Sequence, residues 1–99
     1  MSFQLRVSEA AQKDLERLFE FLAMNDYQAA IRARAAIEKA YDFAETMPFA
    51  CRKADPANPF LRELVIPFGA AGYVALFEVE NNEQVTILAI RHQREEDFH

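Results

Sequence analysis

The chain has 99 residues, of which 52% are hydrophobic and nine are Phe. It contains 11 Lys and Arg and 16 Asp and Glu. We expect residues 1–99 to form a single domain around one core, because this is the size of one compact domain and no stretch is long and apolar enough to span a bilayer. The formal charge of −5 disfavours, without excluding, a protein that grips a polyanion.

The chain opens with a predicted strand and helix. Residues Phe3–Val7 alternate between apolar and polar side chains, which is the pattern of a half-buried strand. Ser8 then suits the N-cap of a helix over Ser8–Met24. The apolar residues of this helix fall along one face: Ala11, Leu15, Leu18, Phe19 and Leu22.

A second predicted helix follows Asn25 and Asp26, which break the first pattern and offer another cap. Its apolar stripe consists largely of Ala and ends near Met47 and Pro48, so this helix can approach a neighbouring layer closely. The two helices form a helical hairpin. The segment Pro48–Pro59 holds three prolines without periodicity and is predicted to be a surface loop.

Three strands are predicted in the remaining chain, over Leu61–Ile66, Tyr73–Glu80 and Val85–His92. Pro67 is expected to end the first of them. The second has apolar residues on both faces and is therefore expected to be central in the sheet. Between the second and third strands, Asn81 and Asn82 suit a two-residue type I′ hairpin. The element order β-α-α-β-β-β predicts an α+β fold, with a helical hairpin packed on a small antiparallel sheet.

In this order and spacing, the sequence resembles the RelE/ParE toxin superfamily over almost its whole length. The resemblance is carried by FQLRVSEAAQKDLERLFEFL, AAIRARAAIEKAYDFAETMP, GYVALFEVENNEQVTILAI and the terminal RHQREEDF. RelE-like members cleave messenger RNA on the ribosome, and ParE-like members are associated with inhibition of DNA gyrase. Both kinds of toxin belong to type II toxin–antitoxin systems.

The residues present resemble the ParE-like branch more closely. In the ribonucleases an Arg commonly follows the aromatic residue that opens the penultimate strand, whereas here Val74 follows Tyr73. A Tyr often placed near the C-terminus of the ribonucleases has no equivalent, since this chain ends in Phe98 and His99. Loss of charge-stabilising and proton-transfer groups argues against efficient RNA cleavage. The resemblance thus implies a non-enzymatic toxin that binds gyrase or a related topoisomerase.

Two binding surfaces are expected. The C-terminal segment is the candidate target-binding site, because Arg and aromatic side chains are enriched at binding hot spots; its members are Arg91, His92, Arg94, Glu96 and Phe98. A solvated strand end with weak ion pairs is the simpler alternative. The resemblance also implies a ParD-like antitoxin that contacts the first helix through Leu18, Phe21 and Leu22, although Leu18 and Leu22 equally suit the core.

Other kinds of site find little support in the sequence. His92 could act as a general acid or base, and a ribonuclease using His92 with Arg91 and Arg94 remains an alternative. A degenerate module that only binds an antitoxin is another. We expect no cofactor, no metal site and no sequence-specific nucleic-acid binding. The lone Cys51 and an N-terminus without a signal core predict a cytoplasmic protein.

Overall fold

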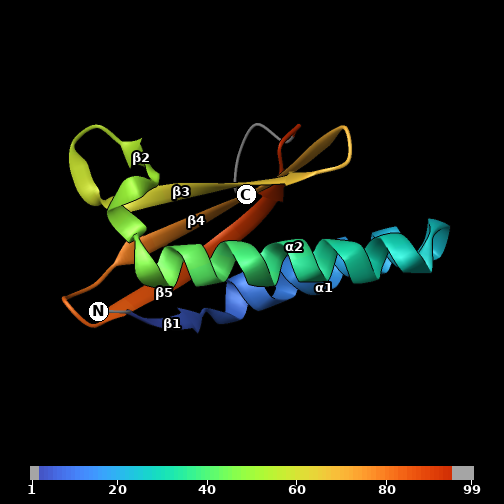
Figure 1. Cartoon of the computed structure of the whole chain (residues 1–99), viewed down its shortest axis with the longest axis horizontal. Helices are drawn as coiled ribbons and strands as arrows, with labels where there is room; N and C mark the ends of the chain where they lie inside the picture. Colours follow the sequence, from blue (N-terminus) through green and yellow to red (C-terminus); the bar gives the residue numbers. More distant parts are fainter. Residues whose placement is uncertain (1–2, 95–99) are drawn as a thin grey trace.

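The computed structural model describes residues 3–94, which form two helices packed on one face of a five-stranded sheet (Figure 1). The elements in chain order are β1 (Gln4–Val7), α1 (Glu9–Asn25), α2 (Tyr27–Thr46), the 3-10 turn η1 (Pro48–Ala50), β2 (Arg52–Asp55), β3 (Asn58–Phe68), β4 (Ala71–Val79) and β5 (Gln84–His92). No helix in this part of the chain has the length and apolar character needed to cross a membrane.

The sheet has the order β1-β5-β4-β3-β2. Strands β3, β4 and β5 form the predicted antiparallel meander, and β1 joins β5 in parallel, so the sheet is mixed and not wholly antiparallel. The α+β class is confirmed, and so is the central position of β4. On the face of β4 that meets the helices, side chains are buried in one core with the apolar residues of α1 and α2. On the other face, Val74 is also buried and is only 2% exposed.

Both helices begin at the predicted caps. The Ser8 side chain accepts a hydrogen bond from the backbone N–H of Ala11 at 3.1 Å, and the Asp26 side chain accepts one from Ala29 at 3.2 Å. These bonds satisfy N–H groups that the first turn of a helix leaves without a partner. The stripes predicted for the two helices meet the sheet through buried residues that include Leu15, Ala33, Ile37 and Ala44.

The prediction of a loop over Pro48–Pro59 is wrong. This segment contains η1 and then β2, which pairs antiparallel with β3, for example Arg52 with Glu63. Strand β2 lies at the edge of the sheet and its side chains are mostly exposed, so it carries none of the apolar alternation by which a strand is recognised. Its strand conformation comes from backbone pairing with β3.

Two strand boundaries also differ from the prediction. Pro67 lies inside β3, opposite Gly72 of β4. On the other edge of β3, the pairing with β2 reaches only as far as Glu63, so no described strand pairs with that edge at Pro67. A proline, which has no N–H to donate, is tolerated there. The hairpin between β4 and β5 is not a two-residue turn. The N–H of Glu80 donates to the carbonyl of Gln84 at 2.9 Å, so the loop consists of residues 81–83.

The start of α1 is attached directly to β5. Strand β1 ends at Val7, and beyond this point the backbone N–H of Ser8 donates to the carbonyl of Ile87 at 2.9 Å and its hydroxyl donates to Leu88 at 3.1 Å. Six residues further along, the carboxylate of Asp14, which is only 8% exposed, accepts a hydrogen bond from the N–H of Ile90 at 2.9 Å. Polar groups of the helix therefore continue the pairing that β1 begins.

We predict that Asp14→Ala lowers the free energy of unfolding by about 1–3 kcal/mol, because the Ile90 N–H would stay buried without this acceptor. Urea unfolding followed by circular dichroism measures the change. Asp42→Ala, at an exposed position of α2, is the control and should change stability by less than about 0.5 kcal/mol. Equal effects of the two substitutions would contradict this account of how α1 is held.

Candidate protein-binding cleft

A cleft lies between the C-terminal half of α1, the β3–β4 turn and the end of β5. It consists of two adjoining hollows of about 300 and 440 Å³ that share Leu18, Phe21, His92 and Arg94. We call it the α1–β5 cleft. The remaining lining comes from α1, the end of β3, the β3–β4 turn and the start of β4: Arg17, Leu22, Phe68, Gly69, Ala70, Ala71 and Tyr73.

The α1 side of the cleft contains all three residues predicted to bind an antitoxin. Leu18 is 7% exposed and belongs to the core, and Leu22 is partly buried against that core. Phe21, by contrast, is 67% exposed, so its ring is the part of this set that a partner could cover. The core interpretation of Leu18 and Leu22 is therefore correct, although both side chains also contribute to the cleft wall.

The opposite wall is an aromatic group built on the pairing of Tyr73 with His92 across β4 and β5. Their rings meet edge to face with centroids 5.8 Å apart, and Phe68 stacks on Tyr73 at 5.9 Å. The backbone N–H of Arg94 donates to Nδ1 of His92 at 3.1 Å. Nδ1 is therefore the acceptor in this hydrogen bond.

Arg91 does not lie in the cleft. Successive residues of a strand face opposite sides, so Arg91 lies on the face away from the helices, opposite Val74. There its guanidinium lies 3.9 Å from the carboxylate of Glu63, which also bonds to Arg52 at 3.0 Å. The sequence analysis placed Arg91 in one target-binding segment with His92 and Arg94. In the structure His92 and Arg94 line the cleft, whereas Arg91 lies on the opposite face of the sheet. Glu96 and Phe98, the other predicted members, lie outside the described residues.

Sequence reasoning missed Arg17 and Tyr73 as cleft residues. Arg17 immediately precedes Leu18 on α1, and its guanidinium lies 3.9 Å from the Asp14 carboxylate. A signal for Tyr73 was present, because antiparallel pairing of two adjacent strands brings the start of one beside the end of the other. A signal for Arg17 was present too, because it lies four residues before Phe21 and therefore on the same helical face. That this face meets the end of β5 depends on how α1 packs on the sheet.

Chemically, the cleft combines apolar surface with cationic and hydrogen-bonding groups. The side chains of Arg17 and Arg94 supply guanidinium donors, and Phe21 supplies exposed aromatic surface. Burial raises the pKa of the Tyr73 hydroxyl, so this phenol stays protonated and is a donor at neutral pH. Within residues 3–94, no group of three or more His, Cys, Asp or Glu is arranged to hold a metal ion.

This fold and cleft can be compared with known proteins. The sequence model of the family described as ParE toxin of type II toxin-antitoxin system, parDE, matches residues 5–97. The chain belongs to this family. It is therefore a ParE-type toxin of a type II toxin–antitoxin system.

Two individual proteins are similar to the chain. Toxin RelE1 of Caulobacter vibrioides is 34% identical over 79 residues, which cover 80% of this chain and 82% of that protein. A solved structure, described as the chromosomal ParDE TA system from P. aeruginosa, superposes with a TM-score of 0.72 at 17% identity, covering 92% of this chain and 96% of the other. The second similarity supports the fold.

Burial of Tyr73 makes the free energy of unfolding fall as the pH becomes alkaline. In the folded chain its pKa is raised, so above the ordinary tyrosine value of about 10 the unfolded chain loses a proton that the folded chain retains. The free energy of unfolding should then fall by up to about 1.4 kcal/mol per pH unit for this group.

We predict that Tyr73→Phe reduces this slope above about pH 10 and leaves the slope unchanged at neutral pH. Tyr41, whose pKa burial also raises, remains in the variant, so the difference between the two proteins isolates Tyr73. Urea unfolding at a series of pH values measures both slopes. Parallel profiles for the two proteins would refute the burial of a protonated phenol.

Proposed function

We propose that the toxin acts without catalysis, by binding DNA gyrase or a related type II topoisomerase through the α1–β5 cleft. The observation that carries this proposal is the composition of the cleft, where the exposed ring of Phe21 lies beside Arg17, His92 and Arg94. Exposed aromatic and Arg side chains around a concave surface are typical of the centre of a protein interface.

The distribution of charge also supports a protein target. The chain carries a net charge of −5, which opposes broad contact with a polyanion. Strand β4 contributes no cation to the cleft: Tyr73 is its lining residue there, and the next residue, Val74, is uncharged and buried on the far face of the sheet. Two guanidinium groups suit the recognition of acidic or hydrogen-bonding groups on a protein surface.

We propose further that a ParD-like antitoxin neutralises the toxin by covering the same cleft. Part of each surface predicted from sequence lines these adjoining hollows: Leu18, Phe21 and Leu22 from α1, and His92 and Arg94 from the C-terminal segment. On α1 beyond Phe21, Met24 is also largely exposed and adds apolar surface. A partner segment placed on this apolar surface would exclude the target by occupying its site.

A second candidate function is RNA cleavage, and one observation favours it. The cleft brings the imidazole of His92 and the phenol of Tyr73 to one wall, with Arg17 and Arg94 also lining it. Proton-transfer groups beside cations are what phosphodiester cleavage requires. The similar Caulobacter protein also bears the name RelE1. Separate assays distinguish the two functions.

We predict that the purified toxin inhibits gyrase supercoiling, and that Phe21→Ala and Arg94→Ala each weaken inhibition at least about tenfold, as expected for hot-spot residues. The measurement is the toxin concentration that halves supercoiling of a relaxed plasmid. The matched control is Phe49→Ala, which removes an exposed ring on η1, away from the cleft.

Prior addition of the cognate antitoxin should restore supercoiling in this assay. Normal supercoiling at saturating toxin would overturn the proposed target. An equal loss of inhibition in Phe49→Ala would instead show that the cleft is not the surface that binds gyrase.

We predict no message cleavage when the toxin is added to a translating extract, because Val74 stands at the position where an Arg commonly follows the aromatic residue of the corresponding strand in the ribonucleases. Primer extension on a reporter message detects cleavage sites. Cleavage by the toxin that is lost in His92→Ala would establish the second candidate function in place of the first.

A further inference from the structure

We propose that the outer edge of β3, where β2 no longer pairs with it, binds an extended segment of a partner protein as an added strand. The apolar side chains of that segment would fill a groove of about 560 Å³ between one face of α2 and the end of β3. We call this site the β3 edge groove. None of its lining residues lines the α1–β5 cleft.

The open edge exists because β2 is much shorter than β3. Strand β2 begins at Arg52, opposite Glu63, and pairs only with the earlier part of β3. Strand β3 continues to Phe68, and on its other side it stays paired with β4 as far as that residue. Within residues 3–94, therefore, no strand pairs with the outer edge of β3 from Leu64 to Phe68.

The backbone groups of Val65 face outwards from this edge. Residues of an antiparallel strand alternate between those that bond to the neighbouring strand and those that face away from it. A Cβ on Gly72 of β4 would meet the carbonyl oxygen of Ile66 and the backbone nitrogen of Phe68, so these two groups face β4. The carbonyl of Gly72, which lies opposite Pro67, accepts instead at 2.8 Å from the N–H that follows β5. The outer edge thus offers the N–H and carbonyl of Val65 and the carbonyl of Pro67.

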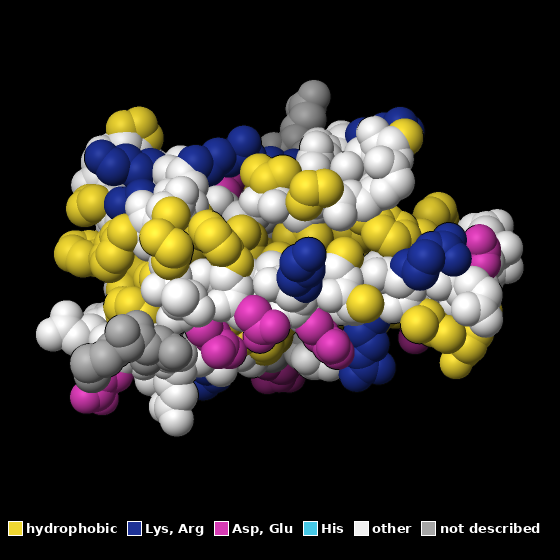
Figure 2. Space-filling model, in the orientation of Figure 1, with side chains coloured by type: hydrophobic (Ala, Val, Ile, Leu, Met, Phe, Trp, Pro, Cys, Tyr) yellow, Lys and Arg dark blue, Asp and Glu magenta, His cyan; other side chains and the backbone are white. Residues whose placement is uncertain are grey.

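Apolar side chains surround the position that an added strand would take. Leu64 and Ile66 point towards the helices and are buried. Across the groove, α2 presents Ala36, Ala40 and the ring of Phe43, which is 45% exposed. Figure 2 shows hydrophobic side chains gathered along the line where α2 faces β3. The groove therefore supplies apolar surface beside unpaired backbone groups.

These features define the chemistry of the occupant. The residue that pairs with Val65 would exchange two backbone hydrogen bonds with it and would point to the face of the sheet away from the helices. Its neighbours in the added strand would point towards α2, because successive side chains of a strand face opposite sides. Apolar residues there would cover Ala40 and Phe43. Lys39, the one charged residue of the lining, favours an acidic residue over a basic one beside them.

A second copy of the chain fits this edge poorly. Antiparallel pairing of two such edges would match Val65 either with itself or with Pro67. In the first arrangement Pro67 would stand opposite Glu63, whose outer edge β2 already occupies. In the second, each pair would lose a hydrogen bond because proline has no N–H. The proposal does not depend on the target of the α1–β5 cleft.

The test is a titration of the 15N-labelled full chain, followed by NMR, with the blocked peptide acetyl-Asp-Val-Thr-Val-Ser-amide. A second peptide is N-methylated at Thr, which removes one backbone donor and leaves the side chains unchanged. The first peptide should shift the signals of Val65, Ile66 and Ala40 saturably and slow hydrogen exchange of the Val65 amide at least about tenfold. The N-methylated peptide should bind at least about tenfold more weakly.

Variants separate backbone pairing from apolar contact. Val65→Pro removes the outward N–H without breaking a bond to β4, and should weaken binding at least about tenfold. Its matched control is Val65→Thr, which keeps the N–H and a β-branched side chain and should change the affinity less than about threefold. Phe43→Ala should also weaken binding, whereas Tyr27→Ala, which removes an exposed ring elsewhere on α2, should not. The dispersion of each spectrum verifies that the variant is folded.

Several results would overturn the proposal. They are the absence of saturable shifts at millimolar peptide, equal binding of the N-methylated peptide, and an unchanged exchange rate of the Val65 amide at saturation. Protection of this amide that grows with protein concentration alone would identify a second copy of the chain as the occupant and would equally overturn it.

Discussion

The attachment of α1 to β5 is the constraint on which the arrangement of this toxin depends. Strand β1 is short, and past Val7 the polar groups of Ser8 and Asp14 take over its role beside β5. A buried N–H without an acceptor is costly, so the bond from Ile90 to Asp14 sets the position of the helix along the strand. That position brings the next turns of α1, with Leu18 and Phe21, over the end of β5, where His92 completes the cleft.

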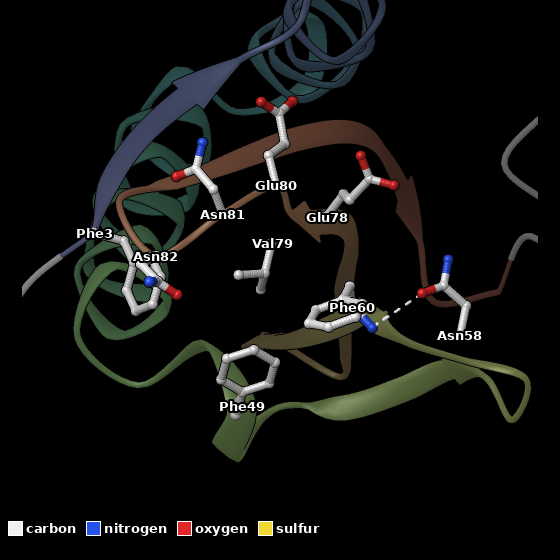
Figure 3. A pocket seen from close by; sticks show the side chains of 9 residues that line it. All are labelled: Phe3, Phe49, Asn58, Phe60, Glu78, Val79, Glu80, Asn81 and Asn82. Carbon is white, nitrogen blue, oxygen red and sulfur yellow. Dashed lines mark hydrogen bonds between the residues drawn. The ribbon is translucent and has the colours of Figure 1, made fainter.

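The two ends of the central strand carry surfaces of different chemistry. Beside Tyr73 the cleft is lined by Arg17, Phe21 and Arg94, whereas at the other end of β4 a pocket of about 440 Å³ is lined by Phe3, Phe49 and Phe60 (Figure 3). The cleft and this pocket share no lining residue, so they are distinct surfaces of the molecule.

Part of the candidate site was predictable and part of it was not. The alternation of side chains along a strand already separates Arg91 from His92, so grouping them as one segment overlooked a periodicity that the sequence contains. Strand β2 gave no such signal, because an edge strand with exposed Arg52 and Lys53 has no apolar face to bury. The loop 81–83 was misjudged for a related reason: two Asn suit a tight turn, but the pairing of Glu80 with Gln84 sets its length.

The sequence by itself determined the α+β class, the caps at Ser8 and Asp26, the apolar helical faces and the central place of β4, because each follows from contacts between residues close in the chain or from a short period. Only the tertiary structure decided that α1 brings Arg17 and Phe21 beside the Tyr73–His92 pair, and that Phe3, Phe49 and Phe60 surround another pocket. These residues are far apart in sequence, and what brings them together is the packing of helices on the sheet, which no local pattern encodes.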